Sequence, residues 1–123
     1  MTDLNFTGGI NIALKIPKAR YEQAVHFYKN VLKLETEERP ISNPTVLKTH
    51  RVVFGANILW LDCMRHATDS EVWLELNTGN VEIATNYLER NGTETCDELE
   101  EIPSNMHWIR DPAGTVFILK PKD

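Results

Sequence analysis

The sequence has few cysteines, no excess of positive charge and no long apolar run, and each shortage excludes a class of protein. Two cysteines in 123 residues, Cys63 and Cys96, form no C-x-x-C motif, so a disulfide framework is not predicted. Thirteen Lys and Arg against eighteen Asp and Glu give a formal net charge of -5, which argues against nucleic-acid binding. No apolar run approaches about 18 residues, so no transmembrane helix is predicted.

The common catalytic motifs are missing as well. The sequence contains no G-x-S-x-G, no H-E-x-x-H, no phosphate-binding glycine loop and no dinucleotide fingerprint. Its first residues have neither a basic segment nor an apolar one, so we expect no secretory signal. These features predict a cytoplasmic protein with reduced thiols that binds neither nucleic acid nor membranes.

The composition is that of one globular domain covering residues 1–123, with 41% hydrophobic and 25% charged residues. Ile12, Leu14 and Ile16 alternate with other residues and predict a strand over 10–17. The next stretch, 19–32, has apolar residues at helical spacing. That stripe consists of Tyr21, Ala24, Val25, Tyr28, Val31 and Leu32. A short strand is expected over 34–39, followed by a hairpin of strands 50–54 and 58–63.

The second half repeats this order. A strand over 72–76 leads to a helix over 80–91, with Asn80 as N-cap and Gly92 in a left-handed C-terminal cap. A weak strand or loop over 93–101 precedes strands 106–110 and 115–119, which the turn Asp111–Gly114 joins. We therefore predict an α+β fold of two βαβββ modules, one over about 8–66 and the other over about 70–121.

Three segments resemble the vicinal oxygen chelate superfamily, which contains glyoxalases, bleomycin resistance proteins and extradiol dioxygenases. They are I-A-L-K-I at 12–16 leading to H-F-Y-K-N-V-L at 26–32, L-E-R-N-G at 88–92, and D-P-A-G-T-V at 111–116. The resemblance covers Ile10 to Leu119. It implies two βαβββ modules whose strands form a curved mixed sheet around a cleft, and a homodimer.

The resemblance also implies where a metal would bind in the family, namely at four inward positions. Carried over one at a time, these positions hold Asn11, Trp60, Glu71 and Ile118. Only Glu71 is a good ligand for a divalent ion, and Trp60 and Ile118 have no group that binds one. We therefore expect no metal site and no other cofactor.

Strand alternation predicts which side chains face the cleft. If Ile12, Leu14 and Ile16 face the first helix, the opposite residues of each strand line the cleft, and His107 lies on a late strand nearby. The predicted ligand-binding residues are Asn11, Lys15, Trp60, Asp62, Glu71, Trp73, Glu75 and His107. Two tryptophans with several carboxylates favour a planar or cationic small molecule. Alternatively, the tryptophans fill a collapsed cleft or a dimer interface, and His107 is a half-exposed strand histidine.

The leading hypothesis is a small-molecule-binding protein of the glyoxalase and bleomycin-resistance type, with a metal-free cleft and an unknown ligand. One alternative is a metal-dependent lyase, isomerase or dioxygenase of the same superfamily. Another is a metal-free enzyme in which Glu71 or Glu75 acts as general base. The catalytic residues are unknown in either alternative.

Overall fold

The structure, a computed structural model, describes residues 4–122. The chain forms two compact units. The first unit is Ile10–Val72, and the second unit combines the segment up to Gly9 with the chain from Trp73 onward. Each unit is described below by itself.

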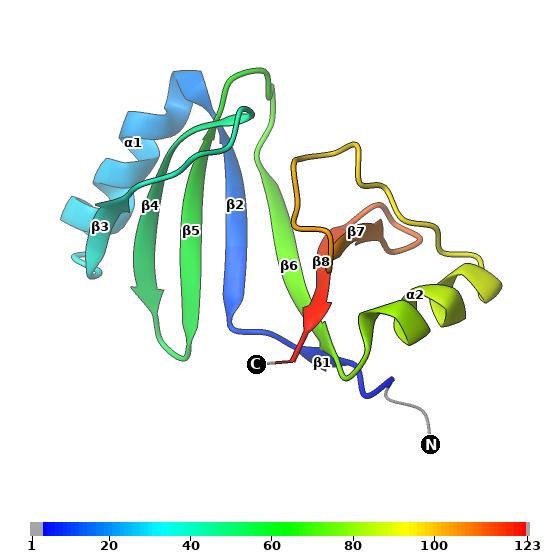
Figure 1. Ribbon diagram of the computed structural model, residues 1–123. Helices are drawn as coiled ribbons and strands as arrows, with labels where there is room; N and C mark the ends of the chain where they lie inside the picture. Colours follow the sequence, from blue (N-terminus) through cyan, green and yellow to red (C-terminus); the bar gives the residue numbers. More distant parts are fainter. Residues whose placement is uncertain (1–3, 123) are drawn as a thin grey trace. The chain divides into compact units, whose positions relative to one another are not determined.

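The first unit contains four strands and one helical segment (Figure 1). Its elements are β2 (Asn11–Pro17), the 3-10 turn η1 (Lys18–Arg20), α1 (Tyr21–His26), the π-helical turn η2 (Phe27–Val31), β3 (Thr36–Arg39), β4 (Val46–Phe54) and β5 (Asn57–Met64). The strand order is β3-β4-β5-β2, with β2 parallel to β5 and the other pairs antiparallel. The predicted strand, helix and hairpin are all present, and the order β-α-β-β-β of this module is confirmed.

The core of the first unit lies between α1 and one face of these strands. As alternation predicts, Ile12, Leu14 and Ile16 pack on this side. The core cluster consists of Ile16, Tyr21, Val25, Val52, Leu59, Leu61 and Cys63, with Ile12, Leu14, Ala24, Tyr28, Leu34 and Leu47 packed against it. The other face of the same strands is therefore left to Asn11, Lys15 and the residues that alternate with Leu59 and Leu61 on β5.

The helical segment differs from the regular helix predicted over 19–32. The N–H of Leu32 donates to the carbonyl of Phe27 at 2.9 Å, an i to i-5 bond that widens the last turn. One extra residue in a turn rotates the following side chains off the predicted stripe. Val31 and Leu32 are accordingly exposed, with 57% and 45% of their surface accessible, where the stripe had placed them in the core.

The second unit has strands β1 (Thr7–Gly8), β7 (His107–Arg110) and β8 (Val116–Pro121), the helix α2 (Val81–Arg90), and the part of β6 (Glu71–Thr78) from Trp73 onward. β6 pairs with β1 in antiparallel and with β8 in parallel fashion, and β7 is antiparallel to β8. No helix within residues 4–122 is long and apolar enough to cross a membrane.

The stretch 93–101, expected to be either a weak strand or a loop, is a loop in the structure. Within the described chain this stretch forms one isolated bridge, Thr95 with Ile109. Asp97 shows why the ladder ends there, because its carboxylate accepts the backbone N–H of Trp108 at 2.8 Å. A side chain thus takes the donor that a neighbouring strand would otherwise use, and the acidic residues that follow stay in a loop.

The predicted turn chemistry of the second unit is confirmed. Asn80 caps α2, since its Oδ1 accepts the N–H of Ile83 at 2.9 Å. Gly92 and Gly114 have φ angles of 90° and 97°, which favour glycine. Asp111 Oδ1 accepts two backbone N–H groups at 2.9 Å and so fixes the turn between β7 and β8.

A buried polar contact joins α1 to the sheet of the first unit. The Tyr21 hydroxyl donates to the carbonyl of Leu61 at 2.6 Å, and His50 Nδ1 lies 2.7 Å from the Tyr21 hydroxyl oxygen. Because the hydroxyl has one proton, His50 Nδ1–H is the donor in the second bond. Burial lowers the pKa of His50, and burial raises the pKa of Tyr21.

His50 makes stability depend on pH. A histidine whose pKa is lowered by folding stays neutral in the folded state, while the unfolded chain takes up the proton below about pH 6.5. The contribution of His50 to the free energy of unfolding is therefore expected to be fully present above that pH and to be lost as the pH drops below it. Urea unfolding at several pH values measures this effect. Between about pH 7.5 and about pH 5.5, the free energy of unfolding should fall less for His50→Asn than for the wild type, and exposed His26→Gln is the control. If the free energy of unfolding depends on pH in the same way for His50→Asn and the wild type, His50 is not the source of the pH dependence.

Candidate functional site

The predicted site residues fall in both units, and their geometry is described unit by unit. In the first unit, Asn11, Lys15, Trp60 and Asp62 share the sheet face opposite α1, as predicted. In the second unit, Trp73 and Glu75 share one face of β6. Glu71 is exposed at the start of β6.

Asn11 and Trp60 contact each other directly. The indole Nε1–H of Trp60 donates to Asn11 Oδ1 at 2.8 Å, and both side chains are half-buried. These are two of the four positions at which the family resemblance implied metal ligands. The amide oxygen is already an acceptor here, and an indole nitrogen has no lone pair to offer a metal. This pair of side chains does not fit a metal-ligand role.

The other two positions do not supply a ligand set either. Ile118 is aligned with Glu75 in the register of β6 and β8, four residues along β6 from Glu71. Isoleucine has no donor atom for a metal. Within residues 4–122, no three side chains of His, Cys, Asp or Glu are grouped closely enough to hold an ion. The donor chemistry at these four positions thus disagrees with the family's metal centre.

Lys15 and Asp62 form a buried ion pair on the face that carries Trp60. Lys15 Nζ lies 2.7 Å from Asp62 Oδ2, and the Thr49 hydroxyl donates to Asp62 Oδ1 at 2.6 Å. Lys15 is 4% exposed and Asp62 7%. These two predicted ligand-binding residues are occupied with one another, so their charges are largely neutralised before any ligand arrives.

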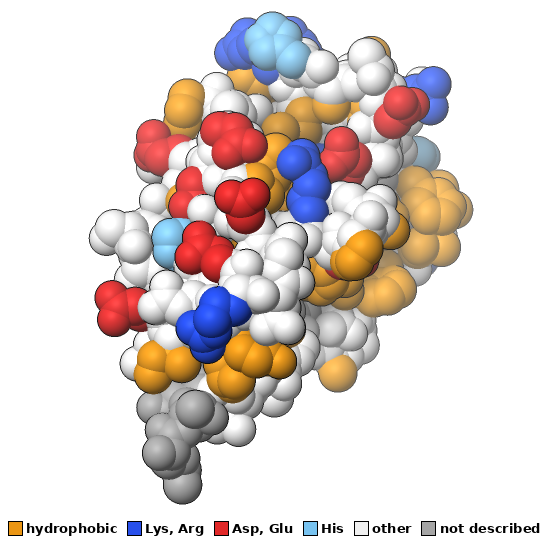
Figure 2. Space-filling view, turned by 90° about the vertical axis from the view of Figure 1, so that its right-hand side faces the viewer, with side chains coloured by type: hydrophobic (Ala, Val, Ile, Leu, Met, Phe, Trp, Pro, Cys, Tyr) orange, Lys and Arg blue, Asp and Glu red, His pale blue; other side chains and the backbone are white. Residues whose placement is uncertain are grey.

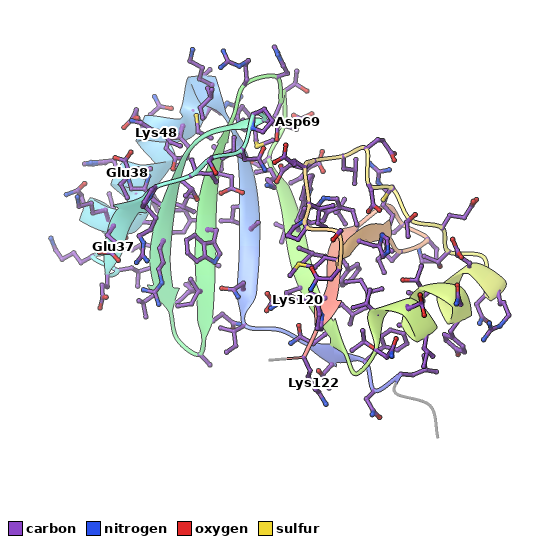
Figure 3. All side chains as sticks on the ribbon, in the orientation of Figure 1. Glu37, Glu38, Lys48, Asp69, Lys120 and Lys122 are labelled. Atoms are coloured by element: carbon purple, nitrogen blue, oxygen red, sulfur yellow. The ribbon has the colours of Figure 1, made fainter. Side chains whose placement is uncertain are left out.

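Arg51 belongs to the same face and was not among the predicted site residues. It lies directly across from Trp60 in the register of β4 and β5 and is half-buried. Glu37 is its neighbour on β3 (Figure 3), but that carboxylate pairs with Arg39 at 2.7 Å. Within residues 4–122, the side chain of Arg51 has no hydrogen bond or ion pair. The two-residue turn Gly55–Ala56 could have revealed it, since that turn sets Arg51 opposite Trp60.

Trp73 is part of a buried aromatic pair in the second unit. Its ring packs edge-on against Trp108, with centroids 4.9 Å apart and an interplanar angle of 66°. Trp108 Nε1–H also donates to the carbonyl of Glu100 at 2.9 Å. Both rings are 7% exposed. Trp73 is therefore mostly a packing residue within its own unit, and the sequence did not reveal its contact with Trp108.

Glu75 is held by neighbours on both sides. Lys120 Nζ on β8 (Figure 3) lies 3.5 Å from Glu75 Oε2, and both side chains are largely buried. A side chain at Gly9 would collide with the Glu75 side chain, so glycine allows this close approach. A carboxylate packed in this way and paired with a lysine is poorly suited to act as a general base on a ligand.

His107 is separated from Trp108 by strand alternation. The two residues are adjacent on β7, so their side chains point to opposite faces of the second unit's strands. His107 Nδ1 lies 2.6 Å from Asp97 Oδ2, and His107 lines a cavity beside α2. The structure thus places His107 apart from Trp73 and Glu75, on the face that α2 covers.

Both cysteines are buried free thiols, in agreement with the expected reduced state. Cys63 belongs to the first unit's core, and Cys96 Sγ lies 3.4 Å from the carbonyl of Trp108. Burial raises the pKa of each thiol, which keeps it in the unreactive form. Neither is a candidate nucleophile.

Comparison with known proteins gives matches in structure. No protein-family model and no curated protein sequence matches the chain. Methylmalonyl-CoA epimerase from Mycobacterium tuberculosis is similar with a TM-score of 0.67 at 13% identity, covering 100% of this chain and 92% of that one. A hypothetical protein from Bacillus halodurans C-125 has a TM-score of 0.66 at 12% identity, with 97% and 96% covered.

A third structure carries a family name. A glyoxalase/bleomycin resistance protein/dioxygenase superfamily member from Vibrio splendidus 12B01 has a TM-score of 0.61 at 14% identity, covering 94% of this chain and 100% of that one. Identities this low show the fold alone. The predicted glyoxalase-like α+β class is confirmed, and the chain has the fold of the vicinal oxygen chelate superfamily.

Proposed function

We propose that this protein binds a planar aromatic small molecule against Trp60, without a metal ion. The observation that carries the proposal is the hydrogen bond from Trp60 Nε1 to Asn11 Oδ1. This bond satisfies the indole N–H and holds the ring in one orientation. Because Trp60 is only half-buried, part of its ring remains accessible to a ligand. A fixed indole gives a large contact area at small entropic cost, which suits stacking.

The charges around Trp60 favour a ligand with a negative group. The sequence had suggested a cation, on the strength of carboxylates beside the tryptophans. In the structure, the carboxylate on the face that carries Trp60, that of Asp62, is paired with Lys15. Arg51 is the charged side chain placed directly beside Trp60, and its guanidinium suits a carboxylate in a bidentate contact. We therefore propose an aromatic carboxylate as the ligand class.

The indole N–H of Trp60 is a direct reporter of such binding. Amide and indole NMR spectra would be recorded with 2-naphthoate, with neutral 2-naphthalenemethanol and with a cationic naphthylammonium compound. We expect 2-naphthoate to shift the Trp60 indole signal, identified by its loss in Trp60→Phe. Trp60→Ala should weaken binding by about 1–3 kcal/mol because stacking is lost. Arg51→Gln should weaken the binding of 2-naphthoate and leave the binding of 2-naphthalenemethanol unchanged.

Two results would contradict the proposal. Tighter binding of the cation than of 2-naphthoate would show that Arg51 does not set the charge preference. Stoichiometric binding of nickel, zinc or manganese would favour a metal-dependent lyase, isomerase or dioxygenase. With nickel or manganese, which are paramagnetic, such binding should also remove the Trp60 indole signal. Arg90→Gln, which removes an exposed arginine on α2 of the second unit, is the control for Arg51→Gln.

Two further parts of the proposal come from the sequence and the resemblance. We propose that the protein acts as a homodimer, as the family resemblance suggests, and that it works in the cytoplasm. Light scattering of the purified protein tests the first, because a monomer at micromolar concentration would contradict it. The ligand experiment above does not depend on the outcome.

A further inference from the structure

A cavity of about 480 Å³ lies in the second unit, beside the first half of α2. Its volume is within the range of small-molecule sites. The lining residues are Asn80, Val81, Glu82, Thr85, Asn86, Ser104, Asn105, His107 and Pro121. All of them belong to the second unit, so this cavity is described without reference to the first.

His107 and Asp97 form an ordered pair at this cavity. Asp97 Oδ2 lies 2.6 Å from His107 Nδ1, and Asp97 Oδ1 accepts the backbone N–H of Trp108 at 2.8 Å. The backbone therefore orients the carboxylate, and the carboxylate orients the imidazole. An ionised carboxylate only accepts hydrogen bonds, so the proton of the neutral imidazole must be on Nδ1.

Nε2 is then the ring nitrogen that carries the lone pair. Within residues 4–122 it has no hydrogen-bond partner, since the contacts of His107 are those of Nδ1. A histidine whose one nitrogen is fixed by a carboxylate and whose other nitrogen is available at a cavity is arranged to accept a proton or a hydrogen bond.

We propose that this cavity binds a small uncharged molecule carrying hydroxyl groups, with His107 Nε2 accepting a hydrogen bond from one of them. The side chains of Ser104, Asn86 and Asn105 both donate and accept, as recognition of hydroxyls requires. The site lies on the other face of β7 from Trp108, within the second unit.

The charges of the second unit favour an uncharged ligand. Glu82 lines the cavity and Asp97 lies behind His107, while no Lys or Arg is among the lining residues. Acidic side chains are also spread over the face drawn in Figure 2. Among the described residues of this unit, the exposed acidic ones are Glu82, Glu89, Glu94, Asp97, Glu98 and Glu101. A phosphate or carboxylate would meet like charge, whereas a neutral sugar or polyol would not.

The test follows the ring nitrogens of His107 by long-range proton–nitrogen NMR at pH 8.5, well above the ordinary titration range of histidine. D-glucose, D-ribose and myo-inositol are the neutral probes, and glucose 6-phosphate is the anionic counterpart. We expect the free protein to show the Nδ1–H tautomer of His107. At least one neutral probe should shift its Nε2 signal, and glucose 6-phosphate should bind less tightly than glucose.

Asp97→Asn separates a positioning role from a purely structural one. The asparagine oxygen can still accept the Trp108 N–H, but its amide group would donate to Nδ1 and move the imidazole proton to Nε2. We expect the tautomer to switch and binding to weaken by about three- to tenfold. His107→Phe should abolish the Nε2 contact, with exposed His26→Phe in the first unit as control. Three results would each overturn the proposal: the Nε2–H tautomer in the wild type, no shift with any neutral probe at about 10 mM (tenfold above a Kd of about 1 mM), or tighter binding of glucose 6-phosphate than of glucose.

Discussion

Replacing Lys15 with methionine is expected to lower the free energy of unfolding by about 3–5 kcal/mol, because it leaves a buried charge without its partner. Asp62 would keep only the Thr49 hydroxyl, at 2.6 Å, while remaining 7% exposed. A buried carboxylate without a partner lowers the free energy of unfolding, even if the intact ion pair contributes little to stability. Urea unfolding at pH 7, followed by circular dichroism, measures the difference.

A compensated variant distinguishes the lost pair from a packing defect. Lys15→Met combined with Asp62→Leu and Thr49→Val removes all three polar groups together, and we expect it to recover most of the stability. Lys48→Met is the matched control, because Lys48 pairs with Glu22 at 3.2 Å on the exposed surface and should have no measurable effect. If the triple variant is as unstable as Lys15→Met, the cost comes from the shape of the side chains rather than from the stranded charge.

This buried pair shows how far the sequence could predict the site. Alternation in Ile12, Leu14 and Ile16 correctly placed Lys15 on the opposite face, and the same rule placed Asp62. Alternation says which face a side chain occupies, but it does not say which residue lies beside it. Lys15 and Asp62 are 47 positions apart and become neighbours through the parallel register of β2 and β5, which no local pattern encodes.

The helical segment and the loop of the second unit show two other limits. The apolar spacing of 19–32 predicted a regular helix, whereas the segment ends in a wider turn with a bond from Leu32 N–H to the carbonyl of Phe27, just before Lys33 with a φ of 58°. The acidic stretch 93–101 was ambiguous between strand and loop, and a side-chain contact of Asp97 decides between them. The second outcome depends on a contact between separate segments, which overrides local propensity.

The face that carries Trp60 was predicted, but its charge was not. Counting carboxylates on inward positions suggested a negative surface, because the count omitted the cations that neutralise them. On this face Lys15 Nζ lies 2.7 Å from Asp62 Oδ2 and neutralises that carboxylate. Arg51 could have been found from the hairpin register, since the turn at Gly55 and Ala56 sets which residue lies opposite Trp60.

The second large effect is expected at Trp108, where replacement by alanine should lower the free energy of unfolding by about 3–5 kcal/mol. The change removes a ring that is 7% exposed and packs against Trp73 at 4.9 Å. It also leaves the carbonyl of Glu100 without the indole donor that lies at 2.9 Å. Urea unfolding gives the stability, and the near-ultraviolet circular dichroism of the tryptophans should lose a large part of its intensity.

Trp60→Ala is the matched comparison, because Trp60 is half-buried and its ring has a polar partner only in Asn11. We expect this variant to lose clearly less stability than Trp108→Ala while losing ligand binding, so that the two tryptophans separate into a binding and a packing residue. The distinction follows from exposure, since a side chain that already meets water gives up less on truncation than one enclosed by its neighbours. If Trp60→Ala unfolds as readily as Trp108→Ala, the indole of Trp60 is needed to fill its own unit, and the proposal of a ligand stacked on it fails.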